Sequence, residues 1–260
     1  MLSALPILVM PMEDPTGRFF SHLQTITPQL KSIFGKAVVS ISPTTIKKNP
    51  HAKEWLESDP FFKVLVEEAG LPAGEHFARL YRYAAASFSP DTIFHLAYID
   101  RLAFALQSEH RPAFVADIQA SVDQSLPLIY ARSPRAWDTH PRNYRDLEGM
   151  VTRVGELLFG KTVDFCWCHL ALTAGQLDRA MEGVTRQDIS MVAEIALGLL
   201  DCVHSVEVDW LAWEDPFSLG VDAVALKAAR EASVEETHKR LAYVIPMLEL
   251  LRRKSSDAGD

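Results

Sequence analysis

The sequence predicts an α/β protein in which a mostly parallel sheet is flanked by helices. Three observations indicate this: an apolar run at 5–10 that ends in a polar turn, a helical pattern over 18–34, and a second apolar run at 37–41. Strand, helix and strand in this order imply a right-handed crossover between parallel strands. Loops that bind ligands are then expected at the carboxyl ends of the strands.

The elements of the first half follow from apolar spacing and from prolines. Within 18–34, Pro28 is expected to kink the helix or to open a new one. Helical spacing continues over about 52–69, where Asp59-Pro60 interrupts it, and over about 74–87. The apolar run 93–99 predicts a buried strand that ends at Asp100, and 102–121 returns to helical spacing.

The second half continues the alternation. Strands are predicted at 126–130, 163–172 and 203–211, with a polar segment at 131–142. Helices are predicted at about 144–159, ended by Gly160 in a left-handed conformation, at 177–182, and at 189–200 with Asp188 or Ser190 as N-cap. The chain is thus expected to form one domain over 1–220, a helical extension over 221–253 in which Pro246 is the exception, and a disordered tail over 254–260.

Composition excludes several classes of protein. Of the 260 residues, 48% are hydrophobic and 23% charged, as in ordinary globular proteins. The net charge of −8 disfavours nucleic acid as a partner. Three cysteines and no run of eighteen apolar residues predict a cytoplasmic protein without a transmembrane segment. The apolar start lacks a basic leader, so it is interpreted as a strand rather than a signal peptide.

Asp100 is the first candidate for a chemical role. A carboxylate at the carboxyl end of a central strand lies where an α/β sheet meets its ligand. Its oxygens suit Mg²⁺ or Mn²⁺ bridging two phosphates. The alternative is that Asp100 caps the following helix or pairs with Arg101.

The segment Tyr98-Ile99-Asp100-Arg101 resembles the Asp-x-Asp segment of the GT-A glycosyltransferases, with Tyr98 in place of the first aspartate. The resemblance continues in order over roughly 5–215. Within it, 129–141 is similar to an Arg-Ala-aromatic-x-Thr-His-Pro stretch in a group of bacterial GT-A-like proteins. It implies a GT-A-like, Rossmann-like fold with a helical C-terminal segment.

The resemblance also implies a ligand, a nucleoside diphosphate sugar, with a small-molecule hydroxyl acceptor and a Mg²⁺ or Mn²⁺ ion at Asp100. The residues that it assigns to nucleotide-sugar binding are Glu13, Thr44, Thr45, Arg79, Asp100, Arg132, Arg135, Thr139, His140 and Glu148. The arginines after 130 have an alternative interpretation, as members of a solvated loop paired with Asp138, Asp146 and Glu148. His140 is a candidate base or a structural histidine.

Asp188 and Glu194 are the candidate catalytic bases, because the GT-A pattern often places an acid just before or within the late helix. A base must reach the attacking hydroxyl within hydrogen-bond distance. The alternatives are that Asp188 caps a helix and that Glu194 lies on an exposed helix face.

Other motifs favour packing or exclude chemistry. Cys166 and Cys168 share one face of the expected strand, which is typical of buried cysteines rather than of a zinc site. Trp210 is expected to pack in the core, whereas Trp213 is left open as a platform for a sugar. The sequence has no Gly-rich phosphate loop and no Gly-x-Ser-x-Gly elbow, which argues against nucleotide hydrolases, dehydrogenases and α/β-hydrolases.

Three hypotheses of function remain. The first is a glycosyltransferase. The second is a GT-A-like protein that binds a nucleotide or nucleotide sugar without turnover, motivated by Tyr98. The third is an interaction protein that docks through the helical segment from Val221 onward.

Overall fold

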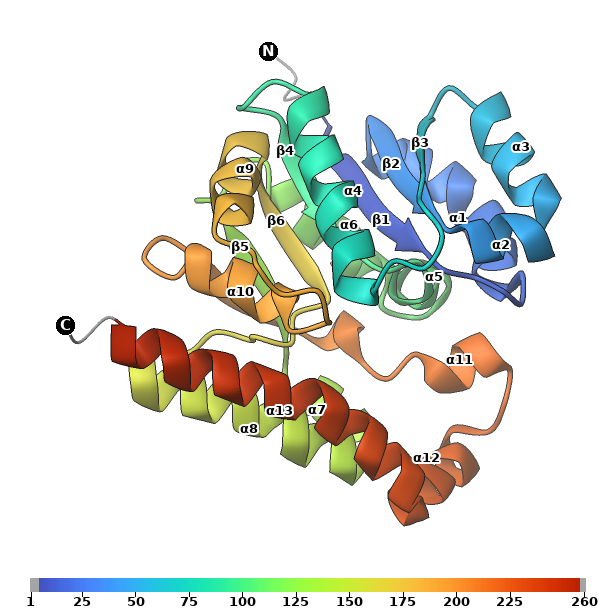
Figure 1. The fold of residues 1–260 in the computed structure, drawn as a ribbon. Coiled ribbons are helices and arrows are strands. Elements are labelled where there is room, and N and C mark those ends of the chain that lie inside the picture. The colour runs from blue at the N-terminus through green and yellow to red at the C-terminus, as the bar shows by residue number, and fades with distance from the viewer. Residues whose placement is uncertain (1–4, 258–260) are drawn as a thin grey trace.

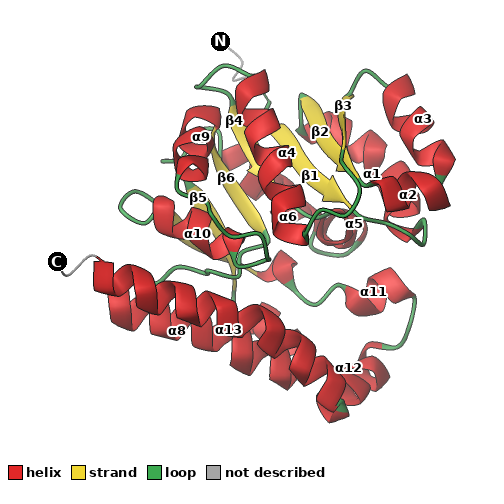
Figure 2. Ribbon diagram, in the orientation of Figure 1, coloured by secondary structure: helices red, strands yellow, loops and turns green. Residues whose placement is uncertain are grey.

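The computed structural model describes residues 5–257 and contains a seven-stranded sheet in the order β3-β2-β1-β4-β6-β5-β7 (Figures 1 and 2). Six strands run parallel, and β6 runs antiparallel between β4 and β5. The predicted α/β class with a mostly parallel sheet is confirmed. The strands are β1 (Ile7–Met12), β2 (Lys36–Ile41), β3 (Phe62–Val66), β4 (Ile93–Leu96), β5 (Leu128–Arg132), β6 (His169–Thr173) and β7 (His204–Val208).

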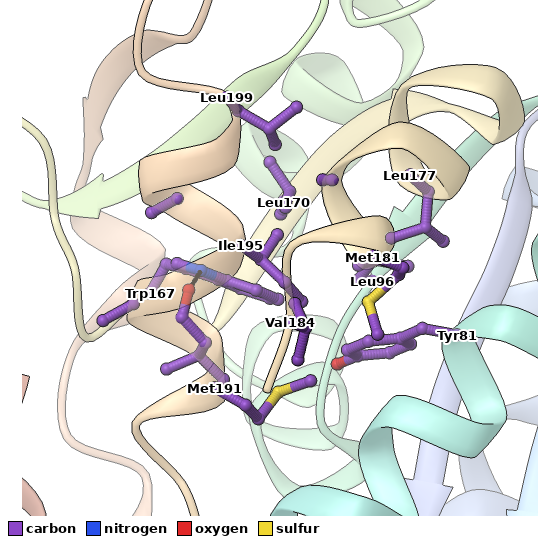
Figure 3. Close-up of a cluster of buried hydrophobic side chains, with 14 of the residues drawn as sticks. Tyr81, Leu96, Trp167, Leu170, Leu177, Met181, Val184, Met191, Ile195 and Leu199 are labelled. Atoms are coloured by element: carbon purple, nitrogen blue, oxygen red, sulfur yellow. Dashed lines mark hydrogen bonds between the residues drawn. The ribbon is translucent and has the colours of Figure 1, made fainter. Parts of the chain in front are cut away.

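Helices cover both faces of the sheet, because its central strands are apolar on both sides. In β1, Val9 belongs to one buried core, whereas Leu8 and Met10 belong to the other. Figure 3 shows part of the first core, with Tyr81, Trp167 and others packed together. Helices α4 (Ala73–Ser87), α9 (Ala174–Glu182) and α10 (Met191–Gly198) contribute to that core, and α1 (Arg18–Ile33), α5 (Ile99–Gln107) and α6 (Arg111–Ala120) to the other.

A pair of long helices lies below the sheet in the view of Figure 1. They are α8 (Arg142–Phe159) and α13 (Val234–Asp257), which pack side by side along much of their length. The remaining helices are α2 (Pro43–Lys48), α3 (Pro50–Ser58), α7 (Pro134–Thr139), the 3₁₀ turn η1 (Asp209–Leu211), α11 (Asp215–Leu219) and α12 (Ala223–Ala232). Among residues 5–257, no helix is long and apolar enough to cross a membrane.

One helix prediction and two strand predictions were wrong in type or extent. The stretch predicted as helix over 52–69 contains the edge strand β3, which pairs with β2 beyond the turn at Asp59. The strand predicted at 93–99 ends at Leu96 because α5 already begins at Ile99. Only the last part of 163–172 is a strand, and 163–168 is irregular. Apolar content alone did not distinguish buried strand from buried loop or helix.

Helix ends were predicted better than helix continuity. Gly160 ends α8 with φ 67°, as expected of a left-handed terminator. Pro28 lies inside one continuous helix, and the predicted helix over 102–121 is two helices, α5 and α6. Helix α13 continues through Pro246 to Asp257, so 254–257 is helical rather than a disordered tail. The last part of the predicted tail, 258–260, lies outside the described residues.

Candidate functional site

A cavity of about 440 Å³ opens beside the carboxyl ends of β1 and β4. Its wall includes Glu13, directly after β1, and the segment 98–101, which begins shortly after β4. Strand β1 pairs with β2 on one side and with β4 on the other, so the strand order reverses here. Ligands of open α/β sheets bind at such a switch point.

The rest of the wall comes from segments far apart in the chain. Arg132 ends β5, Glu148 lies in α8, Glu214 precedes α11 and Arg240 lies in α13. The other lining side chains are mainly apolar, among them Phe19, Phe77, Trp167, Val192, Tyr243 and Met247. A wall of this kind suits a ligand that carries both charged and apolar groups.

Asp100 was predicted to end a strand. It lines the cavity instead from the first turn of α5. Its Oδ1 accepts a hydrogen bond from the backbone N–H of Arg101, 2.9 Å away. Burial raises the pKa of Asp100, and the neighbouring Arg101 opposes this rise. The carboxylate therefore borders the cavity while it also receives a backbone donor of the helix.

Arg101 is bound to Glu214 in a buried ion pair on the cavity wall. Burial raises the pKa of Glu214 to about 7, and the charge of Arg101 acts in the opposite direction. The pair joins α5 to the segment before α11. It also places one guanidinium and one carboxylate beside Asp100.

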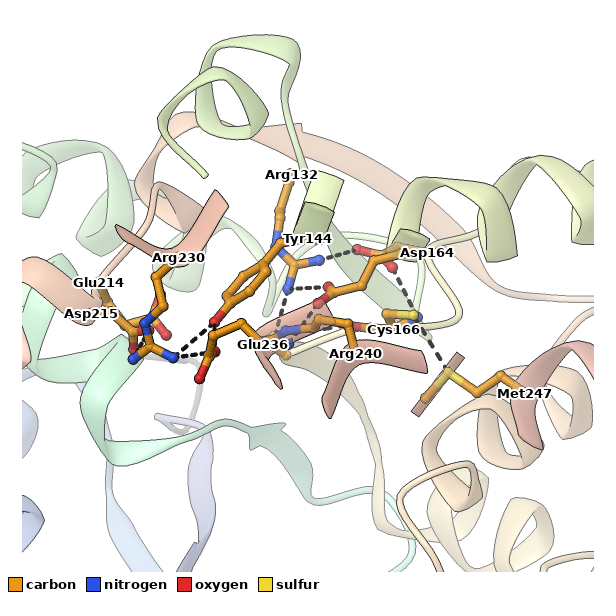
Figure 4. Close-up of polar contacts among 12 residues, drawn as sticks. Arg132, Tyr144, Asp164, Cys166, Glu214, Asp215, Arg230, Glu236, Arg240 and Met247 are labelled. Atoms are coloured by element: carbon orange, nitrogen blue, oxygen red, sulfur yellow. Dashed lines mark hydrogen bonds and ion pairs between the residues drawn. The ribbon is translucent and has the colours of Figure 1, made fainter. Parts of the chain in front are cut away.

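Arg132 is the centre of a buried ion-pair network (Figure 4). Its Nη2 lies 3.3 Å from Glu148 Oε2, and its Nη1 lies 3.3 Å from Asp164 Oδ2. Nη2 also donates to the Cys168 thiol at 3.2 Å, and the guanidinium lies 4.5 Å from the centre of the Trp137 ring. Removing this charge would leave the buried Asp164 without its arginine.

Arg240 connects α13 to this network. Its Nη1 donates to Glu148 Oε1 at 2.7 Å, and its guanidinium lies 3.6 Å from the centre of the Tyr144 ring. Tyr144 in turn donates to Glu236 at 2.7 Å, a contact visible in Figure 4. The C-terminal helix, expected as an extension packed on the main domain, therefore supplies part of the cavity wall.

Three predicted site residues after β5 are not among those that line the cavity. The side chain of Arg135 is 86% exposed and pairs with Asp209. Thr139 Oγ1 accepts the backbone N–H of Trp213 at 2.8 Å. His140 is buried and donates from Nδ1 to the Ala136 carbonyl at 2.9 Å, and burial, reinforced by Arg132, keeps its pKa well below the usual value.

A smaller hollow of about 200 Å³ lies beyond the carboxyl ends of β2 and β3. Thr44, Glu67 and His76 line it, and Glu13 borders both this hollow and the larger cavity. Thr45, predicted to bind ligand, is buried, and its Oγ1 accepts the backbone N–H of Asp14 at 2.6 Å. Thr45 thus joins the segments that follow β1 and β2.

Arg79 lies beside the smaller hollow and faces two glutamates. It donates to Glu68 at 2.8 Å, and its Nε lies 3.4 Å from Glu67 Oε2. The Glu67 side chain is only 1% exposed, and among the described residues neither of its oxygens has a hydrogen-bond partner. Burial raises the pKa of Glu67 to about 7, and Arg79 lowers it by less.

The two predicted catalytic acids are not among the residues that line either space. Asp188 is exposed and accepts the backbone N–H of Ser190 at 2.8 Å. Glu194 is buried and accepts from the backbone N–H groups of Thr185 and Arg186 and from the Thr185 hydroxyl. Their contacts stabilise the segment before α10, and a role as base stays a prediction.

Two cysteines line the larger cavity, and the two tryptophans after β7 are buried. Cys166 and Cys168 are unpaired thiols on the wall of the larger cavity. Trp210 is buried and donates to Asp117 at 2.7 Å, which confirms its expected role in packing, and Trp213 is also buried. Within 5–257, no group of three or more His, Cys, Asp or Glu side chains could hold a metal ion.

Sequence reasoning missed Glu214 and Arg240 as residues of the cavity wall. Neither belongs to a recognisable motif, and Arg240 lies in a helix that was expected to be peripheral. A weak signal did exist for Glu214, which lies within an acidic and aromatic run over 209–217.

Comparison with known proteins adds no relative. No model of a known protein family matches the chain, and no curated protein matches it. The site is therefore interpreted from its own residues and geometry.

Proposed function

We propose that this protein binds a nucleoside diphosphate sugar and transfers the sugar to a hydroxyl acceptor, on a fold of the GT-A type. The observation that carries the proposal is the larger cavity at the switch point between β1 and β4, with three arginines on its wall. The guanidinium fork matches the geometry of phosphate oxygens. The smaller hollow, which shares Glu13, would take the nucleoside.

Arg101, Arg132 and Arg240 would hold the diphosphate. Each is already paired with a carboxylate, so the cavity is not a bare cationic surface. A guanidinium has five N–H donors, so it can bind a phosphate while it keeps a carboxylate partner. Cations held rigidly by such pairs stabilise the charge that develops on a departing diphosphate without reorganising.

Asp100 would contribute one oxygen ligand to a Mg²⁺ or Mn²⁺ ion. The described residues include no group of three or more ligand side chains that could hold a metal ion, so such an ion would need phosphate oxygens and water as its other ligands. Mg²⁺ is commonly bound in this way, by one or two carboxylates together with substrate phosphates. The ion would neutralise diphosphate charge when bound.

A second candidate function is binding of the same ligand without turnover. Two observations favour it: Tyr98 occupies the position of an expected carboxylate, and neither Asp188 nor Glu194 lines the cavity. The two candidates share the ligand and differ only in whether product forms.

The first test is a thermal-shift screen of nucleoside diphosphate sugars, diphosphates and monophosphates, with and without Mn²⁺. A ligand that binds only the native state raises the melting temperature. We expect diphosphates to exceed monophosphates, and Arg240→Gln to reduce this gain relative to its own ligand-free melting temperature. The matched control is Arg135→Gln, which alters an exposed arginine.

A product assay on the wild type then separates the two candidates. Release or transfer of the sugar supports the transferase, whereas binding without product supports the binder. No shift with any nucleotide would overturn both.

A further inference from the structure

The smaller hollow differs from the larger cavity because, among the described residues, three glutamates but no arginine or lysine line it. Glu13, Glu67 and Glu68 line it together with the apolar Pro43 and Leu71. Carboxylates only accept hydrogen bonds, so these glutamates favour a ligand that presents N–H or O–H donors to them, while Ser42, Thr44 and His76 on the same wall can contact other groups of the ligand.

Glu67 is the residue that makes this preference specific. It follows directly on β3, and its backbone N–H donates to the Ile41 carbonyl, which fixes the segment against the end of β2. Its carboxylate is buried, yet neither oxygen has a hydrogen-bond partner among the described residues. Buried carboxylates without hydrogen bonds are costly, so two ligand donors would relieve this cost.

The nucleobases differ in how many adjacent donors they present to such a carboxylate. Guanine offers two neighbouring donors, N1–H and the 2-amino group, which match the two oxygens of one carboxylate. Adenine and cytosine each place a ring nitrogen acceptor beside their amino group, and uracil flanks its single N–H with two carbonyls. Only guanine satisfies both oxygens without a repulsive contact.

We infer that the smaller hollow selects guanine, with the Glu67 carboxylate accepting N1–H and the 2-amino group. The inference rests on the proposed function, since it names the nucleoside of the same donor. Sites built around hydrogen bonds to one ligand reject analogues that lack the donors far more strongly than apolar pockets reject a missing methylene.

The Arg79 side chain would have to move away from Glu67 for the base to bind. Its guanidinium lies next to Glu67 Oε2 without making a hydrogen bond, is one-third exposed and has exposed Glu68 as its other partner. Moving toward Glu68 would uncover the Glu67 carboxylate for the base. The charge of Arg79 would remain close enough to favour the ionised carboxylate.

The test measures binding of GDP, IDP, UDP, ADP and XDP to the full chain by calorimetry. For the wild type we expect GDP to bind about tenfold to a hundredfold more tightly than IDP, which lacks the 2-amino group, and UDP to bind more weakly still. Glu67→Gln replaces one acceptor by a donor, so it should weaken GDP and strengthen XDP, whose 2-carbonyl accepts from an amide. Gain of XDP binding also shows that the variant folds. Glu57→Gln, on the surface of α3 and outside both spaces, is the matched control and should leave the order unchanged.

Three results would overturn the inference. Equal binding of GDP and UDP would mean that Glu67 does not read the base, while the proposed function would stand. Loss of all nucleotides alike in Glu67→Gln, without gain for XDP, would assign Glu67 to the ribose or to the fold. If the wild type binds no nucleotide, the proposed function fails and the selection of guanine fails with it.

Discussion

The larger cavity and the smaller hollow, which share Glu13, differ in how their charged side chains are paired. In the larger cavity, Arg101, Arg132 and Arg240 each have a carboxylate partner within the protein. In the smaller hollow, carboxylates exceed arginines, and the buried oxygens of Glu67 lack hydrogen-bond partners among the described residues. The difference teaches that arginine on a cavity wall can belong to the fold as much as to the ligand, whereas a buried carboxylate that accepts no hydrogen bond indicates what a ligand must supply.

The largest expected effect comes from breaking the network at Arg132. Arg132→Met leaves the buried Asp164 without its arginine, which should cost about 3–5 kcal/mol of unfolding free energy. For a chain of this size the melting temperature should fall by roughly 10 °C. Arg135→Met, in the same arginine-rich segment but exposed, should change stability by under about 0.5 kcal/mol. Equal effects of the two variants in calorimetry would contradict the assignment of Arg132 to the fold.

The next effect is a dependence of stability on pH. The pKa of Glu214 is raised from 4.5 to about 7 in the folded protein, so the folded state binds more protons than the unfolded chain between these values. Stability should therefore fall as the pH rises from about 4.5 to 7. Glu67, with its pKa also raised to about 7, adds to this fall.

Denaturant titrations at pH 5 and pH 7 check this prediction. Glu214→Gln should remove its part of the fall, at most about 3 kcal/mol. Glu57→Gln, on the surface of α3, is the control and should keep the wild-type slope. A slope unchanged in Glu214→Gln would show that Arg101 holds this carboxylate ionised throughout.

The secondary-structure elements that the sequence predicted correctly are those with local signals. The apolar runs at β1 and β2 and the terminator Gly160 are local signals, and these elements formed where expected. Strand β3 was not predicted. It pairs with β2 and is only partly buried, so neither its pairing nor its burial is visible in its own residues, which fitted helical spacing.

The site was harder to predict than the fold for the same physical reason. Arg132, Glu148 and Arg240 meet only because α8 and α13 pack together, and no local spacing encodes that contact. Asp100 was predicted from its place at the end of an expected strand and lines the cavity from the first turn of α5, whereas Glu13, implied by the resemblance, directly follows β1 at the edge where topology indicates binding.

A smaller effect is expected at Asp100. Asp100→Asn keeps the size of the side chain and removes the charge, so Mn²⁺-dependent binding of a nucleoside diphosphate should weaken by at least about tenfold. Binding measured in the presence of a chelator should differ little between the wild type and the variant. Identical affinities with Mn²⁺ would remove Asp100 from the proposed cation site.

The smallest effect is expected at Asp188, and it tests the hypothesis that this residue is the base. A true base contributes mainly in the transition state, so its loss would lower kcat and kcat/KM together by about 10²–10⁴-fold. The structure gives Asp188 a local partner instead, since it accepts from the Ser190 backbone and does not line the cavity. On that geometry Asp188→Ala should lower stability by no more than about 1 kcal/mol and leave nucleotide binding and any turnover unchanged. Glu194→Gln is the companion variant, because it keeps the size of a buried group that accepts three hydrogen bonds. A fall in kcat with normal melting in either variant would restore that residue as the base and would require its side chain to turn toward the cavity, whose wall already includes the nearby Ile189 and Val192.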